Sequence, residues 1–267
     1  MGRFARGGTP GRGRRPTGLA PAVVGAAWGA AILPACAPAR RVPGRGAPAG
    51  APPAVTTSRC DPAGGVHPLP PAVAGEVRDA LAVYGGRLVR WPPDRGRPIR
   101  VWVQPVPAGA RRGARRGLLP GPSAADWTWA AVTGARNWDG VVPGLRFALA
   151  RDSAAADVRV LWEPPGRSSH PGSPPDGSHG HTAVVATSAG VIEGADVTLG
   201  VRAGGARASP ADVQAVAAHE FGHVLGLVHR AESRSAMAPE VRADGASPRD
   251  WAVLRAWYAL PTGPPCR

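Results

Sequence analysis

The sequence predicts a mixed α/β domain, and two observations lead to this fold class. Short segments rich in β-branched residues alternate with longer segments whose apolar residues recur every three or four positions. These are the periods of strands and helices, and their succession along the chain is that of a layered α/β domain. Apolar residues make up 43% of the 267 residues, which is enough for one core, while 37 Gly and 32 Pro require long loops.

Apolar spacing predicts the first two helices. One begins near Pro71 and stops at Gly85 and Gly86, after apolar residues at helical spacing. These are Val73, Val77, Leu81 and Tyr84. The second covers Asp126 to Trp138, and its small residues, such as Gly134, allow another layer to approach closely. One face of this helix combines bulky residues with small ones: Trp127, Ala130, Ala131, Gly134 and Trp138.

Capping signals predict the other two helices. Ser209 as N-cap, Pro210 at the first helical position and Asp212 three residues after the cap open a helix over residues 209–225. The same Ser-Pro-x-Asp order at residues 247–250 opens a final helix. Spacings of three and four place its apolar residues on one buried face. These are Trp251, Leu254, Trp257 and Tyr258.

Alternating β-branched residues predict four strands. They cover Pro98–Gln104, Leu145–Leu149, Ala156–Trp162 and Gly194–Leu199. Residues 163–181 are rich in Pro, Gly, Ser and His, and this composition predicts a surface loop.

The formal net charge of +14 comes entirely from arginine, since the chain has no Lys. No RNA- or DNA-binding motif accompanies this charge. The run at Arg111, Arg112, Arg115 and Arg116 lies among Gly and Ala and is typical of a solvated loop. We therefore expect no nucleic-acid partner.

Residues 1–36 are typical of a secretory signal peptide, with a basic start followed by an apolar stretch from Leu19 to Leu33. This stretch contains Pro and is shorter than the ~20 residues of a membrane-spanning helix. Two processing sites stay open. Leu33 to Cys36 resembles a bacterial lipobox, whose Cys is lipidated, and Ala37 to Ala39 fits ordinary signal-peptidase cleavage.

Residues 37–70 predict a disordered linker of Pro, Gly and Ala, and residues 71–267 the folded domain. If Cys36 is lipidated or removed, Cys60 and Cys266 remain. An even pair of cysteines in an exported protein predicts a disulfide.

The segment HEFGHVLGLVH, from His219 to His229, indicates a metal site. His219 and His223, four residues apart on a helix, project from one face at metal-chelating distance. Gly226 stands where the helix must end, and a left-handed Gly there can bring His229 back to the same ion. Three imidazoles favour zinc and leave the fourth position to water, as in catalytic sites.

Glu220 is the expected catalytic base. It follows His219 but points away from the ligand face, toward the zinc-bound water, so it can take that water's proton without binding the metal. Protonated Glu220 can then give the proton to the leaving amine. The segment therefore predicts zinc-dependent hydrolysis of peptide bonds.

Five fixed positions of this segment match HExxHxxGxxH, and the chain resembles the metzincin metalloproteases, the matrixins in particular. Ser235 to Pro239 resembles their Met-containing turn, with Met237 eight residues after His229. The resemblance covers about residues 88–260. It implies an α+β zincin fold with a twisted five-stranded mixed sheet and two large helices. It also implies an active-site helix, a Met-turn, a C-terminal helix and a substrate cleft along the edge strand.

Two properties of animal matrixins are matched only in part. They bind a second, structural zinc and calcium, and here a second metal site is an alternative to a solvated loop. Its ligands would come from His170, Asp176, His179 and His181. A propeptide Cys also keeps the animal enzymes latent, and the sequence around Cys60 resembles that switch in part. Latency is thus an alternative to the disulfide.

Together these features predict a monomeric zinc endopeptidase that acts on extracellular or cell-envelope proteins and touches a membrane only through a lipid anchor. The alternative is a basic, surface-attached binding module that retains a zinc site without catalysis. Glu220 argues against this alternative, because a structural zinc site has no need of that carboxylate.

Overall fold

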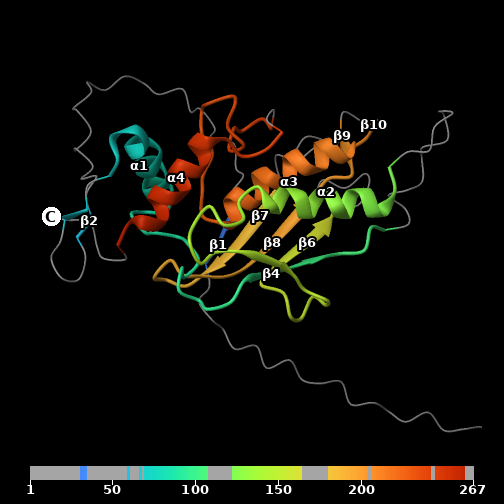
Figure 1. The fold of residues 1–267 in the computed structure, drawn as a ribbon, viewed down its shortest axis with the longest axis horizontal. Helices are drawn as coiled ribbons and strands as arrows, with labels where there is room; N and C mark the ends of the chain where they lie inside the picture. The colour runs from blue at the N-terminus through green and yellow to red at the C-terminus, as the bar shows by residue number, and fades with distance from the viewer. Residues whose placement is uncertain are drawn as a thin grey trace, which may run out of the picture.

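Two helices, α2 (Ala124–Arg136) and α3 (Pro210–Val224), lie side by side across one face of a mixed β-sheet (Figure 1). The computed structural model describes residues 31–34, 59–60, 66–67, 69–107, 122–163, 180–203, 206–241 and 244–261. Contacts of α3 with two strands of the sheet, β7 and β8, place the helix that carries His219 and His223 on this face.

The sheet contains the five strands of the expected mixed sheet and one more. In spatial order the strands are β1 (Ala31–Pro34), β7 (Gly180–Ala186), β8 (Ile192–Leu199), β6 (Val158–Trp162), β4 (Ile99–Val103) and β5 (Phe147–Leu149). Strands β8, β6, β4 and β5 run parallel, whereas β7 is antiparallel to β8 and β1 is antiparallel to β7. The five-stranded mixed sheet is therefore confirmed, and β1 adds a sixth strand beyond β7.

Strand β7 was not predicted, and its first two residues correct the expected loop over residues 163–181. Gly180 and His181 open the strand, while residues 164–179 lie outside the described part of the chain. Buried and half-buried residues alternate along β7. The strand begins with Gly and His directly after a Pro-, Gly- and Ser-rich segment, so the sequence favours a loop at its start.

The four predicted helices are confirmed. Helix α1 (Ala74–Val83) continues a 3₁₀ turn at Pro71–Val73, and it contacts α4 (Pro248–Ala259) at one end of the molecule (Figure 1). Helices α2, α3 and α4 each begin with a capping box, in which a Ser and an Asp three residues later satisfy each other's main-chain N–H. The box of α2 starts at Ser123, so this helix begins two residues earlier than expected.

Buried tryptophans tie the second helix to the third. The indole N–H of Trp127 donates to the Ala208 carbonyl, and that of Trp138 donates to the Ala218 carbonyl. Between them Gly134 faces Ala217 so closely that a Cβ at residue 134 would lie 2.5 Å from the Ala217 Cβ. The expected close approach at Gly134 is therefore confirmed, and α3 provides the second surface.

Two short ribbons complete the described structure. One pairs β2 (Arg59–Cys60) with β3 (Val66–His67) inside the predicted linker, and the other pairs β9 (Arg202–Ala203) with β10 (Ala206–Arg207) just before α3. Cys36, Cys266 and the Arg run at 111–116 lie outside the described residues. Within the described ranges, the structure contains no helix that is both long and apolar enough to span a bilayer.

Candidate active site

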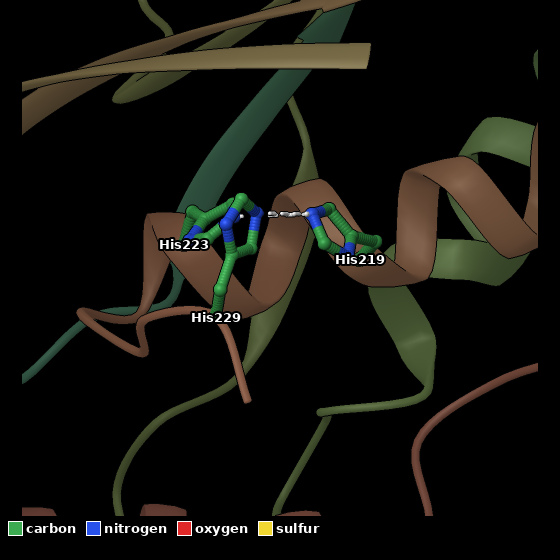
Figure 2. A group of neighbouring side chains, drawn as sticks. All are labelled: His219, His223 and His229. Atoms are coloured by element: carbon green, nitrogen blue, oxygen red, sulfur yellow. Dashed lines mark hydrogen bonds between the residues drawn. The ribbon is translucent and has the colours of Figure 1, made fainter. Parts of the chain in front are cut away.

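Three histidine rings converge on one point (Figure 2). His219 and His223 project from α3, and His229 comes from the loop that follows it. The His219 Nε2 atom lies 3.1 Å from the His223 Nε2 atom and 3.2 Å from the His229 Nε2 atom. In the part of the chain that the structure describes, these residues form the one group of three or more His, Cys, Asp or Glu that could hold a metal.

The chain reversal after α3 depends on Gly226. This residue has φ +90°, in the left-handed region that favours glycine. A Cβ at residue 226 would also collide with the Val89 carbonyl oxygen. The turn is closed by the Leu227 N–H, which donates to the Gly222 carbonyl at 3.0 Å. This reversal brings His229 back beside His219, as the sequence predicted.

Main-chain carbonyls fix the orientation of two of the rings. His219 Nδ1 lies 2.6 Å from the Ala236 carbonyl oxygen, and His223 Nδ1 lies 2.8 Å from the Leu227 carbonyl oxygen. A carbonyl only accepts a hydrogen bond, so both Nδ1 atoms carry the proton and both Nε2 atoms present lone pairs. Such partners behind the ligands are typical of metal-binding histidines.

Burial keeps the three imidazoles neutral. It lowers the pKa of His219 to about 4, with a further contribution from nearby His229, and the hydrogen bond to Ala236 opposes this shift. Burial also lowers the pKa of His223 and of His229. Three neutral imidazoles fit zinc, because a tetrahedral ion with Zn–N bonds of about 2.0–2.1 Å needs ligand nitrogens about 3.3 Å apart.

The Glu220 side chain lies against strand β7 of the sheet. Its side chain is buried, and the Thr182 hydroxyl of β7 donates to its Oε2 atom at 2.6 Å. Burial raises the pKa of the Glu220 carboxyl to about 8, although the hydrogen bond from Thr182 opposes the shift. A carboxyl whose pKa lies near neutrality can both accept and return a proton.

Met237 packs under α3 at the site. Its side chain is fully buried, and its sulfur faces Gly222 so closely that no Cβ fits at residue 222. The Met237 N–H donates to the Ser235 hydroxyl at 2.9 Å. The small residue between the first two histidines of the motif is therefore required by the Met-turn beneath it.

Asp250 holds this turn to the last helix. The buried carboxylate accepts hydrogen bonds from the Ser235 hydroxyl at 2.5 Å and from the Ala236 N–H at 3.1 Å. It also pairs with Arg230 at 2.7 Å, while the Arg230 N–H donates to the Met237 carbonyl. Because the Ala236 carbonyl accepts from His219, the N-terminal cap of α4 supports a ligand of the metal centre.

Of the residues predicted for a second metal site, His181 alone lies in the described part of the structure. His181 lies in β7, half-buried, and is not part of the three-His group. His170, Asp176 and His179 lie outside the described residues, so the second metal site stays a prediction. Cys60 lies in β2, while Cys36 and Cys266 lie outside the described ranges.

Thr182 and Asp250 are the site residues that the motif did not reveal. The sequence predicted Asp250 in the cap of the final helix. Its hydrogen bonds to the Met-turn could be seen only in the tertiary structure. Nothing in the sequence pointed to Thr182, because it lies 38 positions from Glu220 in a strand that was not predicted.

Two comparisons with known proteins bear on this geometry. Residues 128–250 match the sequence model of the family described as Matrixin. A search among curated proteins found no match. The matched segment contains the whole three-His group and ends at Asp250. Residues 128–250 therefore form a matrixin metalloprotease domain, and its three-His group is the HExxH…H triad of a metalloendopeptidase.

Proposed function

We propose that this protein hydrolyses peptide bonds in extracellular or cell-envelope proteins, with zinc held by His219, His223 and His229 and with Glu220 as catalytic base. The observation that carries the proposal is the convergence of three histidine Nε2 atoms, with the buried carboxyl of Glu220 next to His219 in the same helix. Zinc in such a site acts as a Lewis acid on a carbonyl oxygen and acidifies a coordinated water.

A side chain of the protein makes both proton transfers of the reaction. Glu220 accepts a proton from the attacking water and gives it to the amine that leaves when the peptide bond breaks. The intact carboxyl favours an enzyme over a binding module, because a zinc site that is only structural needs no buried acid beside it. No base other than Glu220 is needed for the two proton transfers.

Extended peptides are the proposed substrates. Strand β7 passes Glu220, and its other edge pairs with β1 in antiparallel register, Ala31 with Ala186 and Pro34 with Ala183. Strand β1 lies in the leader that we propose is removed, so this edge becomes available in the mature chain, and an edge that accepts one extended segment through main-chain hydrogen bonds can accept another. This supports cleavage of unfolded or flexible parts of proteins rather than of compact domains.

We propose that the protein is exported, because residues 1–36 are typical of a signal peptide and because matrixins are generally extracellular. The mature chain then begins at or near Cys36, either lipidated there or cleaved at Ala39, and Cys60 pairs with Cys266. Mass spectrometry of the exported protein should find the new N-terminus and a bonded cysteine pair. A chain exported with residues 1–35 intact, or one with both thiols free, would contradict the respective proposal.

Cleavage of labelled casein tests the function directly. We expect cleavage that a zinc chelator stops and added zinc restores. His219→Ala should lose bound zinc and activity together, because two nitrogens hold the ion far less tightly than three. Gly75→Ala in α1 is the control, since a Cβ at residue 75 meets nothing within 4 Å, and it should keep its zinc. Cleavage that persists in zinc-free protein would refute the proposal.

A further inference from the structure

The catalytic carboxyl has a hydrogen-bond partner that lies across a strand-helix contact. The Thr182 Oγ1 atom lies 2.6 Å from the Glu220 Oε2 atom and 3.1 Å from the Glu220 main-chain oxygen. Both side chains are buried, with exposed fractions of 0% for Thr182 and 1% for Glu220. The hydroxyl is therefore a partner that the protein itself provides for Oε2 within a buried contact.

Gly180 approaches the same carboxyl from two positions earlier in the strand. Residues 180 and 182 share one face of β7, because side chains alternate along a strand. A Cβ at Gly180 would lie 2.5 Å from the Glu220 Cγ atom and 2.7 Å from its Cδ atom, too close for any real contact. The bare backbone at Gly180 leaves just enough room for the carboxyl, and the side chain of Thr182 binds it.

We propose that Gly180 and Thr182 are positioning residues that hold the Glu220 carboxyl in the orientation needed for proton transfer. Gly180 leaves the room that the carboxyl needs on the Oε1 side, and Thr182 binds it at Oε2. The proposal rests on the role of Glu220 as base.

The Thr182 hydroxyl has two acceptors within reach, the Oε2 atom and the main-chain oxygen of Glu220. This arrangement suits the two proton transfers that Glu220 is proposed to make. While Glu220 is a carboxylate, the hydroxyl donates to Oε2. When Oε2 carries the proton it can donate to Oγ1, and the hydroxyl can turn to the main-chain oxygen of Glu220. The carboxyl is thus held in place throughout the reaction.

Three threonine variants test the inference. Thr182→Val keeps the shape but removes the hydroxyl, whereas Thr182→Ser keeps the hydroxyl. Thr198→Val is the matched control, because Thr198 pairs with His181 in the sheet and so lies on the opposite face from Thr182. Each variant is measured for kcat and KM on a quenched peptide, bound zinc and Tm, with Glu220→Gln as reference.

We expect Thr182→Val to lower kcat roughly 10- to 100-fold with KM and bound zinc unchanged, the size of a lost hydrogen bond to a charged group. Thr182→Ser should restore kcat to within about threefold of the parent, and Thr198→Val should match the parent. The proposal is overturned if Thr182→Val keeps the parent's kcat, or if the Ser and Val variants lose activity equally.

Gly180→Ala tests the position of Gly180, and it keeps the proposal testable if Thr182→Val does not fold. It leaves the hydroxyl in place but pushes a methyl group into the carboxyl, so kcat should fall while zinc stays bound. An unchanged kcat would show that the Glu220 carboxyl does not need the room that Gly180 leaves. Full activity of the Thr182 and Gly180 variants beside an inactive Glu220→Gln would remove this inference alone, whereas an active Glu220→Gln would remove the proposed base itself.

Discussion

Glu220 lies in surroundings that favour its neutral form. The carboxyl is buried between α3 and β7, and its pKa of about 8 lies well above the ordinary value of 4.5. Between these two pH values the metal-free folded protein keeps a proton that the unfolded chain releases. The free energy of unfolding must therefore fall as the pH rises through this range.

A comparison of the parent with Glu220→Gln measures this effect. The amide does not titrate, so the Tm of metal-free Glu220→Gln should exceed that of the metal-free parent by a margin that grows from about pH 4.5 to about pH 8 and then levels off. Thermal unfolding across this range provides the measurement. A margin independent of pH would show that the carboxyl titrates normally.

Helix packing at the scale of elements depends on a glycine in α2. Gly134 faces Ala217 of α3, and an added Cβ would also lie 2.7 Å from the Gln214 carbonyl oxygen. The sequence suggested this function, because a small residue on a bulky helical face is typical of a close contact. Since α3 carries two metal ligands, this contact also positions the site.

Gly134→Ala should destabilise the protein although alanine favours helices. Overpacking typically costs about 1–3 kcal/mol, which exceeds the gain of about 1 kcal/mol in helix propensity. Gly75→Ala in α1 is the control, because a Cβ there meets nothing within 4 Å, and its Tm should stay unchanged or rise. Chemical denaturation of both variants checks the signs. A stabilised Gly134→Ala would mean that the helices can move apart freely.

Local signals account for the elements that the sequence revealed. The caps at Ser209 and Ser247 specify where α3 and α4 begin, because the paired Ser and Asp act within one turn. Strand β7 was not predicted, because a strand is stabilised by pairing with its neighbour, here β8, and local sequence does not show this pairing. The same holds for the hydrogen bond of Thr182, because its partner Glu220 lies in a helix 38 positions further along the chain.

At the scale of the whole molecule, the metal centre joins three parts of the chain. Helix α3 provides two ligands, the loop after it provides His229, and the Ala236 carbonyl orients His219 through a turn held by Asp250. The motif was sufficient to predict the ligands, since its five positions lie within eleven residues. The support by α4 could not be predicted from spacing, because it depends on tertiary packing.

Zinc should therefore stabilise the entire domain. A ligand that binds only the folded state at 100 times its Kd adds about 2.7 kcal/mol to the free energy of unfolding. We expect chelation to lower the Tm of the parent, and to leave the Tm of His219→Ala nearly unchanged. Equal shifts in both proteins would mean that the stabilising zinc binds elsewhere.

The pH dependence of the metal-free protein should reflect the histidines as well. The pKa of His219 in the folded state, about 4, lies below its ordinary value of 6.5. The unfolded chain therefore binds protons first as the pH falls, and the stability that neutral His219 provides is lost between about pH 6.5 and pH 4. His219→Gln should lose less stability over this range in thermal unfolding. An identical pH dependence in both proteins would contradict this expectation.

Peptide turnover by zinc-loaded Glu220→Gln is the measurement that tests the central claim most directly. The amide keeps the shape of the side chain and an acceptor for the Thr182 hydroxyl but cannot take a proton. We predict that zinc stays bound at one equivalent per chain while kcat falls at least 10²- to 10⁴-fold, the usual loss when general acid–base assistance is removed. Turnover near the parent rate, or release of the zinc, would contradict the assignment of Glu220 as the base beside a three-histidine zinc site.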